Sequence, residues 1–180
     1  IFLGNGEEIR KVQEGIGSKL FFPEEFEKYQ NFIPKKEQSN LMKAYMKRFQ
    51  GKYGKTAKNK AHMNWALWEN TINSVTRKSK KTMKKKLKQN NKYKTLSMIE
   101  CHYFLNRCFL SKNYILNNIH KIKQIPTYIV QGHFDLVCYP IYAYKLHKAL
   151  PNSKLFLTNG GHSNLDEINE KTKYEVMKKY

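Results

Sequence analysis

Two short apolar runs, each leading into a glycine-flanked loop with one ionisable residue, constrain the fold of this chain most strongly. The first run, Thr127–Val130, leads to Asp135, and the second, Lys154–Leu157, leads to His162. A helical stretch separates the two runs, which is the pattern of a strand-helix-strand unit. In sheets built from such units, functional groups gather beyond the carboxyl ends of the strands. The sequence therefore predicts that Asp135 and His162 lie side by side.

A carboxylate beside an imidazole is two thirds of a hydrolytic triad, because the carboxylate sets the tautomer of the imidazole and stabilises the imidazolium. The third member, a nucleophile, is missing, since none of the serines lies in a Gly-x-Ser-x-Gly elbow. The alternatives are a turn-forming role for Asp135 after its strand and an exposed loop histidine for His162. The other histidines have no partner at metal-ligand spacing, so we expect no metal site.

Further segments of the sequence are characteristic: Phe22–Pro23, Ile33–Pro34, Trp65–Glu69, Ile99–Phe104, Ile119–Ile122, Ile125–Asp135, Leu146–Pro151 and Gly161–Ser163. These segments resemble proline iminopeptidases (prolyl aminopeptidases), which are α/β-hydrolases, and the resemblance covers nearly the whole chain apart from the Lys-rich stretch. It implies the C-terminal part of an α/β-hydrolase core with an inserted all-helical cap. The His-Gly-Gly-Pro segment of the family is also absent, and Ile1–Leu3 corresponds to the end of the strand after the nucleophile helix. We therefore expect the missing N-terminal half of the hydrolase core as a partner.

The resemblance further implies a serine exopeptidase that releases N-terminal proline from peptides and needs no cofactor. Asp135 would orient His162, and His162 would activate a serine outside this chain and later protonate the leaving amine. We expect the isolated chain to be inactive, because it lacks that serine. Asp and His are shared by related α/β-hydrolases, so a hydrolase of esters, amides or epoxides is the alternative.

Two glutamates are candidates for substrate binding, and the resemblance implies that they hold the amino terminus of the substrate. Glu69 and Glu100 each lie in an aromatic segment, where a carboxylate does not serve packing alone. Burying a charge costs free energy unless it is paired, and the α-ammonium of a peptide is a suitable partner. The alternatives are a helix-surface acid for Glu69 and a salt bridge to a lysine for Glu100.

The chain divides into three predicted regions. Residues 1–6 end a core strand, 7–118 form a helical cap domain, and 119–180 form the C-terminal part of the hydrolase core. Within the cap, Pro23 precedes two acidic residues that favour a first helical turn. A second helix is expected to begin at Pro34.

The net charge of +20 comes from 30 lysines and only four arginines against 14 acidic residues. Because arginine is the usual residue for forked recognition of phosphate and guanine, we expect no specific nucleic-acid partner. Ten basic residues fall within 77–94 with almost no apolar periodicity, which predicts a solvated or disordered insertion. A basic nucleic-acid-binding module and a non-catalytic module stay open as alternatives from another class.

Three cysteines without C-x-x-C spacing give no disulfide framework, which favours a reducing, cytoplasmic compartment. No apolar run approaches the ~20 residues that span a bilayer, so we expect no membrane partner.

Overall fold

The computed structural model describes residues 8, 12–76, 79–163 and 166–179. The described chain forms two compact units. The sheet unit consists of Glu8, Ile72–Thr76 and the described residues from Leu110 onward, and the helical unit consists of the described residues of 12–71 and 79–109. The strand end expected over residues 1–6 lies outside the described residues.

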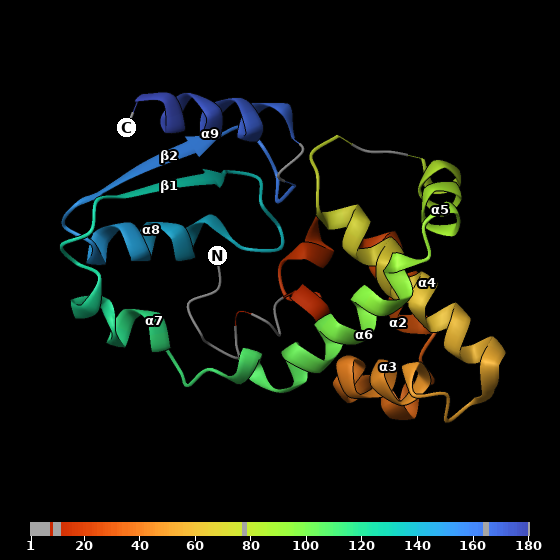
Figure 1. The fold of residues 1–180 in the computed structure, drawn as a ribbon. Helices are drawn as coiled ribbons and strands as arrows, with labels where there is room; N and C mark the ends of the chain where they lie inside the picture. The colour runs from red at the N-terminus through yellow and green to blue at the C-terminus, as the bar shows by residue number, and fades with distance from the viewer. Residues whose placement is uncertain (1–7, 9–11, 77–78, 164–165, 180) are drawn as a thin grey trace. The chain divides into compact units, whose positions relative to one another are not determined.

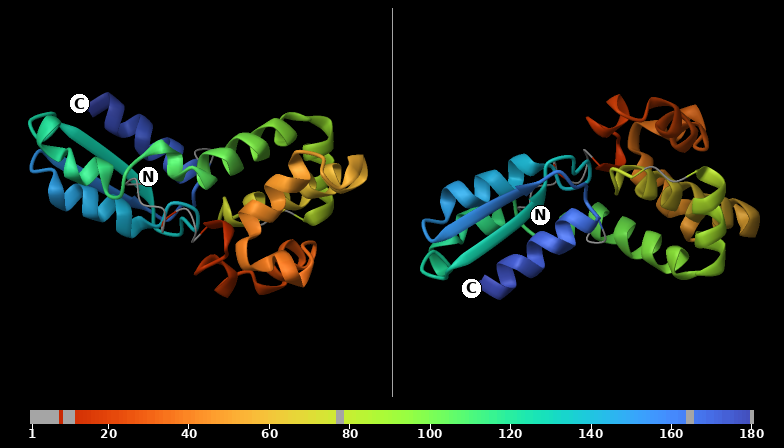
Figure 2. Two further views of the ribbon diagram at one scale, coloured as in Figure 1. Left: turned by 90° about the horizontal axis from the view of Figure 1, so that it is seen from below. Right: turned by 90° about the horizontal axis from the view of Figure 1, so that it is seen from above.

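The sheet unit is built on two parallel strands, β1 (Thr127–Gly132) and β2 (Ser153–Thr158). The register runs from Thr127 opposite Ser153 to Gly132 opposite Thr158. The other elements of the unit are α7 (Tyr114–Asn117), η4 (Ile119–Lys121), α8 (Pro140–Ala149) and α9 (Glu167–Lys179). Figures 1 and 2 show α8 and α9 on opposite sides of the two strands. The predicted strand-helix-strand unit is confirmed.

Local sequence accounts for these elements. Both strands carry central β-branched or aromatic residues, such as Ile129 in β1 and Phe156 in β2, which favour strands. Helix α8 begins with Pro140 at its first position, where the missing backbone N–H has no intrahelical partner to lose. Its buried side chains, Tyr142 and Leu146, pack with Ile129 of β1 in one apolar cluster.

The helical unit contains η1 (Ser18–Leu20), α2 (Pro23–Asn31), η2 (Lys35–Asn40), α3 (Leu41–Phe49), α4 (Gly54–Ile72), α5 (Lys80–Gln89), α6 (Lys92–Leu105) and η3 (Arg107–Phe109). Its core is aromatic. Tyr29 of α2 stacks on Tyr45 of α3 with ring centroids 4.6 Å apart, and Trp65 of α4 meets Tyr45 edge-on at 5.6 Å. Each such pair stabilises a core by about 0.5–1.5 kcal/mol, in addition to the contribution of the apolar area that it buries.

Two expectations for this unit are corrected. The helix expected from Pro34 is a 3-10 stretch followed by α3, because Asn40 has non-helical dihedral angles and its side chain accepts a hydrogen bond from the Lys43 backbone N–H. The Lys-rich stretch, expected to be solvated or disordered, has exposed lysines, in agreement with a solvated segment, but it contains helix α5. Ser79 caps that helix by accepting from the Thr82 N–H, and lysine, leucine and methionine all favour helices.

The described part is thus mostly helical with a small parallel sheet. Among the described residues, none of the helices combines the length and the apolar character needed to cross a membrane.

Candidate active site

The sheet brings the two ionisable loop residues together at the carboxyl ends of β1 and β2. The loop after β1 bonds to the end of β2, since His133 N–H donates to the Thr158 carbonyl at 2.8 Å and Phe134 N–H donates to the Gly160 carbonyl at 3.0 Å. His162 Nδ1 lies 3.1 Å from Asp135 Oδ2. The predicted juxtaposition is therefore confirmed, whereas the role of each residue in catalysis stays a prediction.

Gly132 allows this close approach, and Gly160 leaves room for the Asn169 side chain. A Cβ on Gly132 would collide with the carbonyl oxygens of Gly161 and Gly160, and a Cβ on Gly160 would collide with the Asn169 side chain. The backbone before Asp135 and the backbone before His162 therefore pass each other at a distance that only glycine permits. The distance between the carboxylate and the imidazole therefore depends on Gly132.

The Asp135 carboxylate is buried and fully engaged as an acceptor. Oδ1 accepts from the N–H groups of Val137, at 2.9 Å, and Cys138, at 2.7 Å. Oδ2 accepts from the side-chain amide of Gln131 at 3.0 Å and from His162. Burial by itself would raise the pKa of Asp135, but the His162 contact and the backbone N–H groups outweigh it and lower that pKa. Asp135 is therefore a stable anion.

His162 presents Nδ1 to Asp135, so Nδ1 carries the proton that it donates to the carboxylate. Burial alone would lower the pKa of His162, but the hydrogen bonds with Asp135 and the Cys138 thiol outweigh it and raise that pKa to about 10. The imidazole is consequently protonated at neutral pH in this chain. Its side chain keeps 36% of its surface exposed, against 6% for Asp135.

Residues that sequence reasoning missed hold the His162 loop. Asn169 of α9 donates from Nδ2 to the carbonyls of Gly161 and Ser163, both at 3.0 Å. Asp166 accepts from the Gly161 N–H at 2.7 Å and from the Ser74 hydroxyl at 2.6 Å. Asn169 is buried although it is polar. Its position in an otherwise ordinary helix gives no local signal of this role.

Gln131 was also missed. It is the polar residue near the end of an apolar strand, and it is buried. Its amide donates to Asp135 and to the Cys138 carbonyl at 3.1 Å, so it ties the strand to the Asp135 loop. A buried polar side chain in an apolar run is a signal that could have identified it, since such groups need partners.

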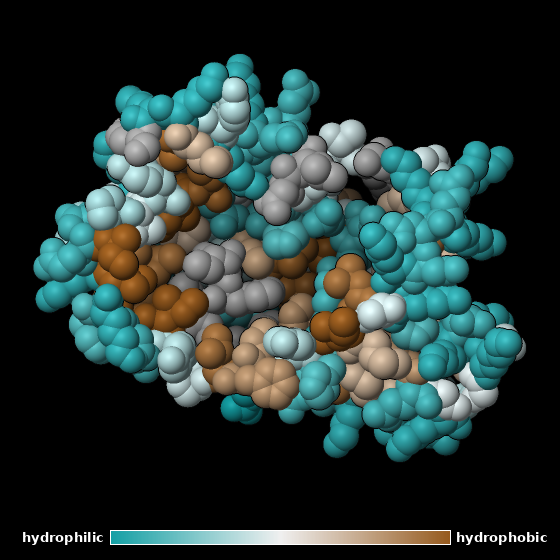
Figure 3. Space-filling model, in the orientation of Figure 1, coloured by the Kyte–Doolittle hydropathy of each residue, from teal (hydrophilic) through white to brown (hydrophobic). Residues whose placement is uncertain are grey.

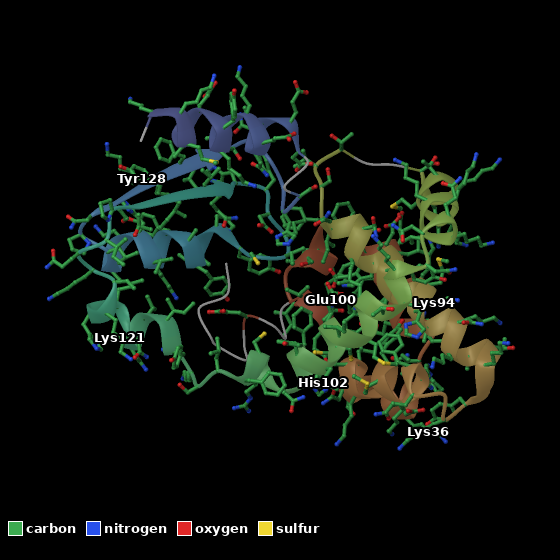
Figure 4. The ribbon with its side chains drawn as sticks, in the orientation of Figure 1. Lys36, Lys94, Glu100, His102, Lys121 and Tyr128 are labelled. Carbon is green, nitrogen blue, oxygen red and sulfur yellow. The ribbon has the colours of Figure 1, made fainter. Side chains whose placement is uncertain are left out.

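The two predicted substrate-binding glutamates belong to the helical unit, where each is half-buried beside the aromatic core. Glu100 of α6, labelled in Figure 4, accepts from Trp65 Nε1 at 3.0 Å. Glu69, one helical turn after Trp65 on α4, accepts from the side-chain amide of Gln13. Gln13 in turn accepts from the Tyr29 hydroxyl at 3.1 Å. The aromatic surroundings expected for both carboxylates are present, whereas binding of an ammonium group stays a prediction.

Within the described residues, no cluster of His, Cys, Asp and Glu side chains could hold a metal ion. The three cysteines are free thiols. What the sheet unit offers chemically is thus an anionic carboxylate that orients an imidazole.

This chain is similar to known proline iminopeptidases. It is 34% identical over 152 residues to a probable proline iminopeptidase of Leptolyngbya boryana, covering 83% of this chain and 46% of that protein. It is 33% identical over 186 residues to a putative proline iminopeptidase of Mycoplasma genitalium (100% and 58%) and 34% identical over 167 residues to a proline iminopeptidase of Arabidopsis thaliana (91% and 43%). No family model matches the sequence. The chain spans about half the length of the curated relatives it matches.

Proposed function

Because the chain is similar to proline iminopeptidases over nearly its whole length, we propose that it supplies the carboxylate and the imidazole of a serine exopeptidase that releases N-terminal proline. The observation that carries the proposal is the contact between His162 Nδ1 and Asp135 Oδ2 at the carboxyl ends of two parallel strands. In this proposal, the sheet unit is the C-terminal part of an α/β-hydrolase core and the helical unit is its cap.

The roles follow from the tautomer. With Nδ1–H donating to Asp135, Nε2 is the nitrogen that can take a proton from a serine hydroxyl as that oxygen attacks the peptide carbonyl. Asp135 stabilises the imidazolium that results, and the imidazolium then protonates the leaving amine. The serine and the oxyanion-hole donors come from the N-terminal half of the core, since the 180 residues contain no Gly-x-Ser-x-Gly segment.

The pKa of His162 sets a condition on this mechanism. A general base must be neutral at the working pH, whereas the contacts with Asp135 and Cys138 raise the pKa of His162 to about 10. Burial is the cause that lowers this pKa, and the His162 side chain is still 36% exposed. We propose that the N-terminal half of the core covers His162 and brings its pKa down toward neutrality.

Glu69 and Glu100 are proposed to receive the α-ammonium of the substrate. Both carboxylates are half-buried among aromatic side chains, where a bound cation would offset the cost of desolvating them. Trp65 donates to Glu100, and Gln13 donates to Glu69, so each carboxylate is oriented by a neutral donor.

The test uses the protein that contains this chain together with the coding sequence upstream of it. We expect that sequence to encode Gly-x-Ser-x-Gly, and the protein to hydrolyse amides of free N-terminal proline faster than N-acetylated proline amides. Preferential hydrolysis of simple esters or epoxides would favour the alternative hydrolase. Absence of an upstream serine elbow, with no turnover of any of these substrates, would contradict the proposal.

A further inference from the structure

Positive charge is concentrated in the helical unit. The residues assigned to that unit include 24 Lys and Arg against 7 Asp and Glu, a net charge of +17, whereas the sheet unit has 10 against 7, a net charge of +3. No acidic residue occurs between Glu69 and Glu100 in the sequence. The centre of this acid-free segment is helix α5, and the proposed aminopeptidase chemistry makes no use of it.

Helix α5 is amphipathic, with six lysines among its 10 residues and a short apolar edge. Met83 and Leu87, four residues apart, are its apolar residues and are half-buried, whereas its lysines are exposed. At 100° per residue, Lys80, Lys84 and Lys88 form one ridge beside Met83 and Leu87, and Lys81 and Lys85 form the adjacent ridge. Five lysines thus share one broad face, and successive members of each ridge are about 6 Å apart along the axis.

None of the six lysines of α5 forms a salt bridge with a residue that the structure describes. Other lysines do form salt bridges, such as Lys47 with Glu37. The pKa of Lys80 is lowered, first by burial and then by the like charges of Lys28 and Lys84, which together outweigh the opposite effect of the Glu25 carboxylate. Uncompensated like charges repel one another, so a bound polyanion would stabilise this face.

We propose that the lysine face of α5 binds the phosphate backbone of duplex nucleic acid without sequence preference. Lysine is a compact point charge suited to phosphates, and α5 contains no arginine for forked contacts with guanine. Helix α5 also has no aromatic side chain on which a single strand could stack. Its apolar residues are both half-buried, which leaves no free apolar face to insert into a bilayer. A helical row of lysines without an arginine, an aromatic side chain or a free apolar face suits a regular array of phosphates.

The figures show the surface concerned. The surface over α5 is hydrophilic in Figure 3, and nitrogen-tipped side chains project from α5 in Figure 4. Neutralising about five phosphates predicts that log K falls with log salt with a slope of about −4.5, a loss of affinity of roughly 500-fold between about 50 and 200 mM salt.

The test compares two quadruple variants of the 180-residue chain that remove the same charge. The first replaces Lys81, Lys84, Lys85 and Lys88 of α5 by Gln, which has a similar helix propensity and leaves Met83 and Leu87 in place. The second replaces four exposed lysines of the sheet unit by Gln, namely Lys112, Lys121, Lys123 and Lys148. Fluorescence anisotropy measures binding to DNA and RNA duplexes of about 20 base pairs. We expect the α5 variant to bind at least about ten-fold more weakly, with a slope of log K against log salt that is smaller in magnitude by about four. The sheet-unit variant should keep most of the affinity and most of the slope.

Replacing the same four α5 lysines by Arg keeps the charge and is expected to keep binding to duplexes of any sequence. Circular dichroism and thermal melting check that each variant is folded. Equal losses in the two Gln variants would overturn the proposal, because the total charge and not α5 would then be responsible. Absence of duplex binding by the parent chain would also overturn it, as would α5-dependent binding only to vesicles containing phosphatidylserine. Equal affinity for DNA and RNA would support backbone recognition, and loss of affinity on changing the duplex sequence would contradict it.

Discussion

At the scale of single residues, the anionic state of Asp135 follows from its contacts. A carboxylate has about four lone-pair sites, and here two backbone N–H groups, one amide and one imidazole occupy them. Each donor stabilises the charged form, which is the form that can in turn stabilise an imidazolium. This arrangement makes Asp135 difficult to replace, because even an isosteric amide places a donor where acceptors are needed.

We predict that Asp135→Asn lowers the pKa of His162 from about 10 toward or below its ordinary value of 6.5, since the carboxylate contacts raise it. NMR titration of the imidazole in this chain measures the change. In the protein that also contains the nucleophile, the same substitution is expected to reduce kcat on the order of 10⁴-fold, because the wrong tautomer is favoured. Glu170→Gln, an exposed acid on α9, is the control. An unchanged His162 pKa would mean that Asp135 does not set the charge of the imidazole.

Glu69→Gln and Glu100→Gln separate ammonium binding from packing. Gln keeps an oxygen that can accept from Trp65 Nε1 or from the Gln13 amide, so the contacts seen here can persist while the charge is removed. We expect kcat/KM on substrates with free N-terminal proline to fall roughly ten- to a hundred-fold, which corresponds to about 1.5–3 kcal/mol. Turnover of an N-acetylated or simple ester substrate should hardly change. Equal losses on free and blocked substrates would make these glutamates structural.

At the scale of elements, a buried histidine joins α4 to α6. The Ser97 hydroxyl lies 2.7 Å from the Tyr93 carbonyl, to which it donates, and forms a hydrogen bond with His62 Nδ1, also at 2.7 Å. His62 also stacks on Phe49, with ring centroids 4.4 Å apart. Burial, followed by the charges of Lys58 and Lys94, lowers the pKa of His62 to about 4. The helix pair is therefore assembled around a neutral imidazole.

The pH dependence follows from this lowered pKa. The His62 imidazole binds a proton near pH 6.5 in the unfolded chain but only near pH 4 in the folded chain. His62 therefore contributes stability that is present above pH 6.5 and is lost as pH falls toward 4. We predict that the free energy of unfolding in urea decreases across this window in the parent chain and decreases less in His62→Gln. His120→Gln, which removes an exposed histidine, should behave like the parent. The same slope in His62→Gln and the parent would contradict this prediction.

The loops that follow β1 and β2 depend on Gly132. We predict that Gly132→Ala destabilises the chain by about 1–3 kcal/mol, because the added Cβ collides with backbone oxygens that cannot move as a flexible side chain would. The loops should separate, and the pKa of His162 should then fall as its contact with Asp135 weakens. Thermal melting and NMR titration of His162 measure the two effects. An unaltered melting temperature together with an unaltered His162 pKa would show that the loops tolerate the extra carbon.

At the scale of the whole molecule, the chain contains an acid-histidine pair without a serine elbow. We predict that the purified 180-residue chain does not hydrolyse proline amides, since catalysis by such a pair needs the nucleophile and the oxyanion donors. Turnover by the purified chain that a serine-directed reagent abolishes would refute this prediction.

The whole molecule also shows which features local sequence can predict. The sequence predicts strands at Thr127–Val130 and Lys154–Leu157, a helix that starts at Pro23 and the meeting of Asp135 with His162. All of these depend on short-range propensities and on the rule that parallel strands end at one edge. The aromatic surroundings of Glu69 and Glu100 were also visible, since Trp65 and Tyr103 lie beside them in sequence. In contrast, the sequence does not predict helix α5, because its apolar residues are a single pair, Met83 and Leu87, which gives almost no helical periodicity among the lysines.

The sequence by itself determined the type and order of the elements around the acid-histidine pair and the family that the chain resembles, because both depend on residues close together in the chain. Only the tertiary structure decided which groups support the pair. Ser74 bonds across 92 positions of sequence to Asp166, which in turn accepts from the Gly161 N–H. In the helical unit, Trp65 donates to Glu100 across 35 positions. Hydrogen bonds between such distant residues depend on how the chain folds back on itself. No local propensity or spacing encodes that geometry.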